Sequence, residues 1–223
     1  RRQAAGGRRQ AAGGRRQAAI FCCDNRCIMA LPAFLHILQA STIQHQHTHG
    51  CNAHFFEDGE GLWQLVQQHQ PRHILELGSG LGYTACLMAL ASPQARVDTL
   101  EGDAEHATLA RQHIRMGGLE QRVHLHEGSF ATVLPAMQLP PRSLDFVFFD
   151  GNSPPLILVR GLHALLRHGG LLACANLEIS WPQGSRRVKA ELDNPQRWQK
   201  ITTIENGQTQ VVAALHPTEA TPA

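Results

Sequence analysis

The 223-residue sequence predicts an α/β protein with a doubly wound, mostly parallel sheet of seven strands and a C-terminal antiparallel hairpin. Three observations lead to this prediction. Short apolar runs alternate with helix-like segments from about residue 71 onward, which is the pattern of consecutive βα units. A glycine-rich turn follows the first apolar run, as at a strand end that binds a ligand. Near the C-terminus, Asn206-Gly207 separates two β-prone runs, which is typical of a hairpin.

Each element follows from a local pattern. Helices are expected at residues 31–40 and 58–69, where apolar side chains recur at helical spacing, and a polar, histidine-rich connection joins them through His54. The run LDFVFF at residues 144–149 is apolar enough for a central strand. Gly117-Gly118 and Gly169-Gly170 are the expected stop signals of two later helices. The other strands are expected at residues 73–77, 96–100, 123–126, 171–175, 199–204 and 210–215, and the helices between them at residues 84–91, 104–116, 156–167 and 184–192.

The chain contains 20 basic and 18 acidic residues, but the basic excess is confined to its first 28 positions. Residues 1–19 repeat the unit RRQAAGG with a seven-residue period, which a seven-base DNA repeat (AGGCGGC) would encode. We therefore interpret residues 1–28 as a disordered, non-native leader and expect the native chain to begin near Met29. The alternative is an arginine-glycine tail that binds RNA. Without the leader the chain is mildly acidic, which removes the argument for a nucleic-acid partner.

The remaining composition bears on the compartment. No apolar run reaches the roughly 18 residues that a membrane span needs, and no secretory signal is visible. Cys86 and Cys174 lie in apolar stretches and are expected to be small buried side chains. The sequence therefore predicts a cytoplasmic protein without a membrane partner.

The segment ELGSGLGYT follows the first expected strand and contains Glu76, Gly78, Gly80 and Gly82. Its glycines allow a tight turn and a close approach to a ligand. The spacing is G-x-G-x-G, whereas a dinucleotide fingerprint places its third glycine one position later. The negative charge of Glu76 favours a cationic ligand end over a pyrophosphate. Glu101 closes the second strand, where its carboxylate can accept the ribose hydroxyls of an adenosine. This combination predicts S-adenosylmethionine, which carries a sulfonium and an amino group.

Five ordered segments, ELGSGLGYT, TLEGD, HEGSF, LDFVFFDG and LLRHGGLLACANL, resemble the motifs of class I S-adenosylmethionine-dependent methyltransferases. Within that class they are similar to the O-methyltransferase family that includes the catechol and caffeoyl-CoA enzymes. The resemblance covers roughly residues 57–215 and implies a Rossmann-like methyltransferase fold. It also implies further site residues: Tyr83 and Thr84 near the methionine end of the cofactor, Gly128, Ser129 and Phe130 beside the adenine, and Asp150 facing the methyl donor and the acceptor.

The sequence departs from the family at its catalytic centre. Metal-dependent members hold a divalent cation with an Asp after the fourth strand and an Asp-Asn pair after the fifth. Asp150 and Asn176 match, but Ala175 replaces the second acid. Ser153 or a neighbour lies where those members carry a lysine base. The resemblance therefore implies methyl transfer without an intact divalent-metal site, and no metal ligand is assigned.

His45, His47, His49, Cys51 and His54 form a dense set of potential ligands. A transition-metal site is chemically feasible there, but the spacing matches no zinc signature and the intervening polar residues favour a solvated loop. The segment precedes the core as the acceptor-covering segment does in the resembling family. His54 is therefore a candidate catalytic base, and the alternative is a loop histidine without a catalytic role.

Taken together, the sequence predicts a methyltransferase that uses S-adenosyl-L-methionine and methylates a small-molecule acceptor, on oxygen. Residues 29–70 form the helical, acceptor-covering segment, residues 71–216 the methyltransferase core and residues 217–223 a disordered tail. Asp150 and His54 are the catalytic candidates, and a homodimer is compatible with the sequence. The alternative function is a catalytically silent sensor or partner protein that binds S-adenosylmethionine. An NAD-dependent oxidoreductase is disfavoured by the glycine spacing and by Glu76.

Overall fold

The computed structural model of the chain describes residues 31–51, 53–151, 154–177 and 182–217. The expectations for residues 1–28, for Ser153 and for nearly all of the C-terminal tail lie outside these residues. None of the described helices combines the length and apolarity that a bilayer crossing requires.

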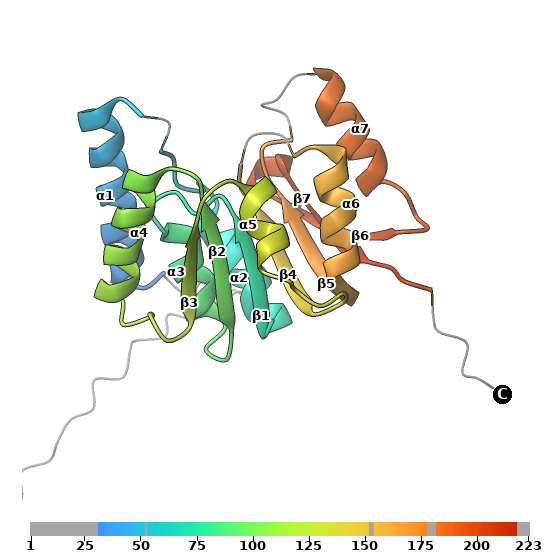
Figure 1. Cartoon of the computed structure of the whole chain (residues 1–223), viewed down its shortest axis with the longest axis horizontal. Helices are drawn as coiled ribbons and strands as arrows, with labels where there is room; N and C mark the ends of the chain where they lie inside the picture. The colour runs from blue at the N-terminus through green and yellow to red at the C-terminus, as the bar shows by residue number, and fades with distance from the viewer. Residues whose placement is uncertain (1–30, 52, 152–153, 178–181, 218–223) are drawn as a thin grey trace, which may run out of the picture. The chain divides into compact units, whose positions relative to one another are not determined.

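The described residues form one seven-stranded sheet with helices on both faces (Figure 1). The strand order is β3-β2-β1-β4-β5-β7-β6. The first five strands of this order run parallel, and β7 runs antiparallel to both β5 and β6. The predicted fold class is therefore confirmed. The strands are β1 His73–Leu77, β2 Arg96–Glu101, β3 Val123–Glu127, β4 Leu144–Phe149, β5 Leu166–Cys174, β6 Trp198–Ile204 and β7 Thr209–Ala214.

Alternating side chains of the strands feed two apolar layers. In β4, Phe146 and Phe148 pack on the face covered by α1 to α4, whereas Val147 and Phe149 pack on the face covered by α6 and α7, with α5 at its margin. The predicted burial of Cys86 and Cys174 is confirmed. The helices are α1 Ala33–His49, α2 Gly59–His69, α3 Tyr83–Ala91, α4 Ala104–Met116, α5 Phe130–Ala136, α6 Leu156–Leu165 and α7 Pro182–Leu192, and a short 3₁₀ turn, η1, covers Glu205–Gly207.

The structure corrects the predicted end of the first helix. α1 continues through the histidine-rich stretch to His49, where Gly50 in the left-handed conformation ends it. The predicted solvated loop at His45, His47 and His49 is therefore wrong. Leu35, Leu38 and two buried polar side chains further along give α1 an inner face that sequence polarity concealed, and packing of that face stabilises the helix.

Two further boundaries differ from the prediction. Gly169 and Gly170 do not stop α6, which ends at Leu165; they lie within β5, at a register shift against β4. Glycine tolerates such irregular strand backbone, so the same residues are compatible with either role. The short helix α5 was not predicted, because Pro135 near its end and its few residues give little helical signal.

The strand order reverses between β1 and β4. β2 and β3 are added on one side of β1, and β4 and the later strands are added on its other side. Ligands of open α/β sheets bind at the carboxyl ends of strands at such a switch point. The turn after β1 and the residue after β4, Asp150, lie at this place. The fold therefore positions the predicted site residues at one edge of the sheet.

A buried carboxylate of β2 links three neighbouring parallel strands. Asp98 of β2 is fully buried and accepts hydrogen bonds from His73 Nε2 at 3.0 Å, Arg96 Nε at 3.0 Å and His126 Nε2 at 2.8 Å. Burial opposes ionisation of Asp98, but these hydrogen bonds more than offset it and hold its pKa well below the usual range. One charge thus joins β1, β2 and β3.

We expect Asp98→Asn to lower the free energy of unfolding by about 1–3 kcal/mol. The Asn side chain replaces one carboxylate oxygen with an NH₂ group, so the His and Arg groups that donated to that oxygen lose their acceptor. Urea denaturation at pH 7 measures the change. Glu120→Gln, at an exposed acid, is the matched control and is expected to have no measurable effect. Equal stability of Asp98→Asn and the wild type would contradict the role of this network.

Candidate functional site

The turn after β1 brings its backbone against the end of β4. Gly78, Gly80 and Gly82 have φ of +100°, +51° and +87°, which L side chains rarely adopt. At Gly78 the constraint is also spatial, because a Cβ there would lie 2.4 Å from the carbonyl oxygen of Asp150. Gly82 then caps the N-terminus of α3. The glycine pattern is therefore explained by close packing at the switch point.

Glu101 fastens this turn to the end of β2. The backbone N–H groups of Gly78 and Ser79 donate to the carbonyl of Leu100, at 3.0 and 3.1 Å. The N–H of Gly80 donates to Oε2 of Glu101 at 2.7 Å, and the N–H of Asp103 donates to Oε1 at 2.9 Å. The Glu101 side chain is 12% exposed. Its carboxylate is thus held in one place beside the glycine turn.

Glu76 lies beneath the turn and is completely buried. The hydroxyl of Thr84 donates to Oε1 of Glu76, and the hydroxyl of Thr99 donates to Oε2 at 2.5 Å. Burial raises the pKa of Glu76 to about 8, against the effect of these hydrogen bonds, and the charges of Asp150 and Glu101 act in the same direction as burial. A cation bound above the turn would offset this penalty and favour the ionised carboxylate.

Asp150 follows β4, and its main chain packs against Gly78 of the turn. The amide of Asn176, after β5, donates to Oδ1 of Asp150 at 2.9 Å and to the carbonyl of Gly151 at 3.2 Å. Burial raises the pKa of Asp150 to about 6, and the nearby negative charge of Glu205 adds to the shift. At neutral pH, Asp150 is therefore a stronger base than an ordinary carboxylate.

Glu205 is a site residue that the sequence reasoning missed. It follows β6, and its N–H donates to Oδ2 of Asp58 at 2.7 Å. The hydroxyl of Thr209 donates to Oε2 of Glu205 at 2.6 Å. Because β6 is parallel to β5 in direction, its carboxyl end lies at the same edge of the sheet as Asp150. The available signal was a carboxylate beside the Asn-Gly hairpin turn.

The segment after β3 lies beside the end of β2. The N–H of Gly128 donates to the carbonyl of Glu101 at 2.8 Å. Ser129 precedes α5 as its N-cap, and Phe130 begins the helix. The Phe130 ring meets that of Phe149, at the end of β4, edge to face at 6.1 Å. The predicted adenine-side residues therefore lie next to Glu101 and to the end of β4.

Two predicted residues have side chains engaged elsewhere. Tyr83 is buried, and its hydroxyl accepts a hydrogen bond from Gln39 of α1 at 3.0 Å; burial raises its pKa to about 12. His54 is exposed, and its ring lies 3.3 Å from the amide nitrogen of Gln46. No contact among the described residues joins the His54 ring to Asp150. The carbonyl oxygen of His54, however, lies 3.4 Å from where a Cβ of Gly80 would be.

The residues at the turn fit a polar ligand. Ser79 Oγ is buried and has no hydrogen-bond partner among the described residues, and a buried hydroxyl of this kind costs free energy unless a ligand completes it. The first turn of α3 offers backbone N–H groups to such a ligand.

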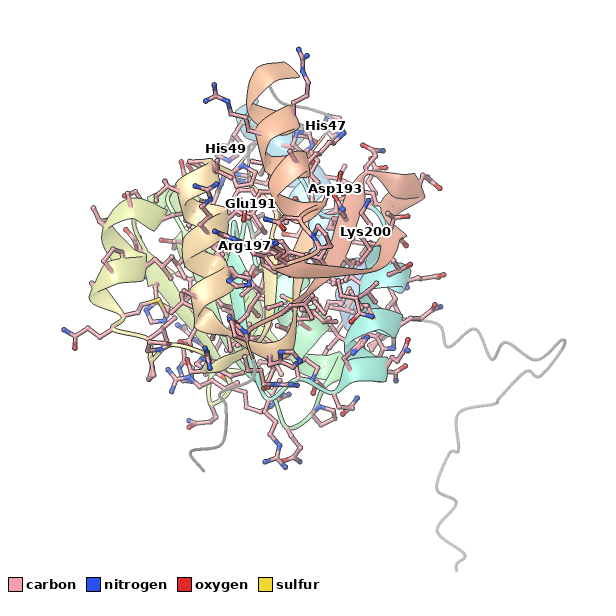
Figure 2. All side chains as sticks on the ribbon, turned by 90° about the vertical axis from the view of Figure 1, so that its right-hand side faces the viewer. His47, His49, Glu191, Asp193, Arg197 and Lys200 are labelled. Atoms are coloured by element: carbon pink, nitrogen blue, oxygen red, sulfur yellow. The ribbon has the colours of Figure 1, made fainter. Side chains whose placement is uncertain are left out.

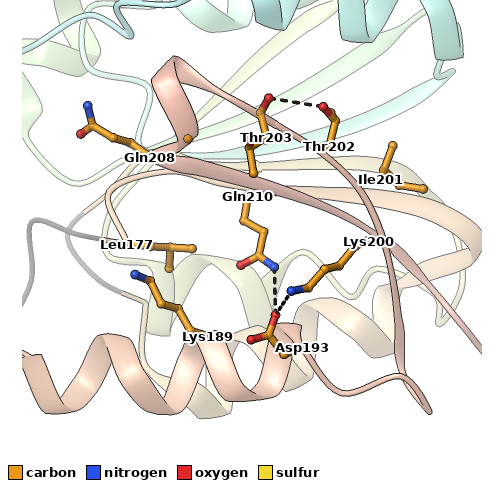
Figure 3. Close-up of a pocket in the computed structure, with 10 residues that line it drawn as sticks. Leu177, Lys189, Asp193, Lys200, Ile201, Thr202, Thr203, Gln208 and Gln210 are labelled. Carbon is orange, nitrogen blue, oxygen red and sulfur yellow. Dashed lines mark hydrogen bonds and ion pairs between the residues drawn. The ribbon is translucent and has the colours of Figure 1, made fainter.

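A groove lies away from the glycine turn. It has a volume of about 570 Å³ and lies between α7 and the β6–β7 hairpin (Figure 3). Lys200 and Gln210 both contact Asp193 there, at 2.7 and 3.3 Å. Figure 2 shows Glu191 on the same helix, paired with Arg197 at 3.1 Å. None of the predicted site residues lines this groove, and its Lys200 and Asp193 form an exposed ion pair.

Comparison with known proteins agrees with the geometry. A sequence profile of the O-methyltransferase family matches residues 28–206, so the chain belongs to that family. Catechol O-methyltransferase of Niastella koreensis is 36% identical over 99 residues, covering 44% of this chain and 45% of the relative. Catechol O-methyltransferase B of Danio rerio is 35% identical over 128 residues, covering 54% and 48%. The chain thus spans about half the length of these curated relatives.

Solved structures support the same family fold. A putative O-methyltransferase from Klebsiella pneumoniae superposes with a TM-score of 0.70 and 26% identity, covering 83% of this chain and 91% of the other. The O-methyltransferase of Bacillus cereus, solved in complex with SAH, has a TM-score of 0.69 and 24% identity, covering 85% and 93%. The likeness to the second structure is one of fold.

We expect Glu76→Gln to stabilise the free protein, and more so at high pH. With a pKa near 8, folded Glu76 keeps a proton that the unfolded chain releases above pH 4.5, so wild-type stability falls as the pH rises between these values. The variant lacks this loss. Its gain in free energy of unfolding should be larger at pH 8 than at pH 5 by on the order of 2–4 kcal/mol.

Urea denaturation of the wild type and the variant at both pH values measures this difference. Glu120→Gln serves again as the control and should show no dependence of its effect on pH. A gain of the same size at pH 5 and pH 8 would contradict the buried, protonated state of Glu76.

Proposed function

We propose that the chain transfers a methyl group from S-adenosyl-L-methionine to a hydroxyl oxygen of a small molecule. The observation that carries the proposal is the convergence of Glu76, Glu101 and Asp150 around one glycine turn, at the carboxyl ends of β1, β2 and β4. Family membership supports the reaction class, and the curated names of the relatives support an oxygen acceptor.

Each group of residues around the glycine turn has a role in holding the cofactor. Glu101 accepts the ribose hydroxyls, for which its fixed carboxylate is suited. Glu76, with Thr84, stabilises the cationic end, and the turn glycines Gly78, Gly80 and Gly82 let the backbone approach; Tyr83 contributes its backbone N–H, since its hydroxyl is engaged with α1. Gly128, Ser129 and Phe130 border the adenine. When bound, S-adenosyl-L-methionine would supply a methyl group from its sulfonium to an oxygen nucleophile, with S-adenosylhomocysteine as the leaving group.

On the acceptor side, Asp150 is the proposed base. Asn176 fixes its carboxylate, and its pKa of about 6 suits it to take a proton from an acidic hydroxyl. His54 is the second candidate, because its main chain borders Gly80 although its ring contacts Gln46. Holding donor and acceptor in line contributes the larger part of the rate, and proton removal is a secondary demand.

We infer that this transfer does not use a divalent cation beside Asp150. The position that would supply the second acid is Ala175, which is completely buried and offers no side-chain oxygen. Hard cations need several oxygen ligands, and Asp150 belongs to no group of three close acidic, histidine or cysteine side chains among the described residues. The acceptor hydroxyl is then one that loses its proton readily without a metal.

The proposal also covers the setting of the enzyme. It includes residues 29–70 as the acceptor-covering segment and residues 71–216 as the methyltransferase core. It further includes a location in the cytoplasm, no nucleic-acid or membrane partner, and a homodimer as the compatible assembly. The alternative is a protein that binds S-adenosylmethionine without turning it over.

We expect Glu101→Ala to weaken the binding of S-adenosylhomocysteine by about tenfold to a hundredfold, which corresponds to about 1–3 kcal/mol for ribose hydroxyls left without an acceptor. Glu127→Gln is the matched control, because Glu127 lies opposite Glu101 at the end of β3 and pairs with the surface residue Arg111. Its dissociation constant should be that of the wild type. An unchanged constant in Glu101→Ala would contradict the ribose role.

We expect the purified chain to methylate a phenolic or other acidic hydroxyl in a panel of phenols, catechols, acids and amines given radiolabelled methyl donor. The desalted protein should be active, and added magnesium should change its turnover by less than about twofold, because Ala175 removes a ligand. Turnover that depends on magnesium would contradict the metal-free reaction. Binding of the donor without label in any acceptor would favour the catalytically silent alternative.

A further inference from the structure

The end of α1 and the start of α4 bring metal-binding side chains together outside the proposed cofactor site. His45 lies in the last turns of α1, and Cys51 follows the left-handed Gly50 that ends the helix. His106 lies in the first turn of α4. Cys51 Sγ and one ring nitrogen from each histidine all lie within 4.8 Å of one another. Tetrahedral ligands bound at about 2.0–2.3 Å are about 3.3–3.8 Å apart, so small side-chain rotations suffice to bind one ion.

His45 carries an independent sign of a missing partner. Its side chain is 7% exposed, and its Nε2 is buried with no hydrogen-bond partner among the described residues. An unpaired buried nitrogen costs free energy, so such atoms are rare without a ligand or a water. A metal ion bound to this nitrogen would satisfy it.

Carboxylates surround the three ligands and add negative charge. Oε1 of Glu105 lies 3.4 Å from Nδ1 of His49 and 4.0 Å from Nδ1 of His45. Oε1 of Glu101 lies 4.0 Å from Nδ1 of His106. Carboxylates next to the second nitrogen of a metal-bound histidine orient the ring and increase its basicity. The rings of His45 and His106 meet edge to face at 5.3 Å, which fits two imidazoles around one centre.

We propose that His45, Cys51 and His106 bind one Zn²⁺ ion, with the fourth position taken by water. Imidazole with thiolate is a donor set that zinc prefers, whereas magnesium and calcium prefer oxygen. On binding, Cys51 loses its proton to solvent and coordinates as the thiolate. This site is separate from the family's cation position beside Asp150.

The ion would join the acceptor-covering segment to the start of α4, next to the proposed cofactor site. α1 belongs to residues 29–70, and α4 begins three residues after Glu101. A bond from His45 and Cys51 to His106 therefore fixes the end of α1 beside the carboxylate that holds the glycine turn. The role is structural, and the inference does not depend on the proposed methyl transfer.

The test uses the full chain with Cys22, Cys23 and Cys27 changed to serine, so that cysteines outside the described residues do not contribute. Chelator-treated protein is titrated with Zn²⁺ against a chromophoric chelator, and in parallel with Co²⁺ as a spectroscopic probe. The ligand variants are His45→Gln, Cys51→Ser and His106→Gln. His47→Gln is the matched control, because His47 is an exposed histidine on the same helix.

We expect about one equivalent of zinc to bind, a weakening of at least about a hundredfold in each ligand variant, and wild-type binding in His47→Gln. Co²⁺ should give a thiolate charge-transfer band in the unmodified site, a result that needs no variant to fold, and the band should disappear in Cys51→Ser. Absence of both zinc binding and the Co²⁺ band would overturn the proposal. Binding lost in His49→Gln and Glu105→Gln but kept in Cys51→Ser would overturn this ligand set.

Discussion

Gly78 lies so close to the main chain of Asp150 that a Cβ would be 2.4 Å from the carbonyl oxygen, and the arrangement of the site depends on this approach. It brings the ends of β1 and β4 together where the strand order reverses. Glu76 then lies under the turn, completely buried, and Glu101 reaches the N–H of Gly80 from β2. The same contact that packs the sheet edge therefore gathers three carboxyl groups around one glycine turn.

Concentrating carboxyl groups in a buried place costs stability, and the pKa values show where. Burial raises the pKa of Glu76 to about 8 and that of Asp150 to about 6. Asp98, also buried but surrounded by two histidines and an arginine, shifts the other way. The fold thus satisfies the charge of Asp98 internally, whereas burial disfavours the ionised forms of Glu76 and Asp150 until a ligand stabilises them, as is common at functional sites.

The sequence predicted elements well where a short local pattern suffices. The bounds of β1, α4 and β4 agree with it, because each depends on a compact apolar run or on clear stop residues. It was wrong where distant packing decides: α1 extends to His49 because its inner face packs on the rest of the fold. At the site, the glycine turn, Glu101 and Asp150 follow from spacing. Glu205 and the grouping of His45 with His106 depend on contacts between segments far apart in the chain.

The central claim is that the glycine turn at the β1–β4 switch point binds an S-adenosyl ligand rather than a dinucleotide. Calorimetric titration of the full chain with S-adenosylhomocysteine and, separately, with NADH tests it most directly. The buried Glu76 and the G-x-G-x-G spacing predict saturable binding of S-adenosylhomocysteine and none of NADH. Binding of NADH without binding of S-adenosylhomocysteine would contradict the account.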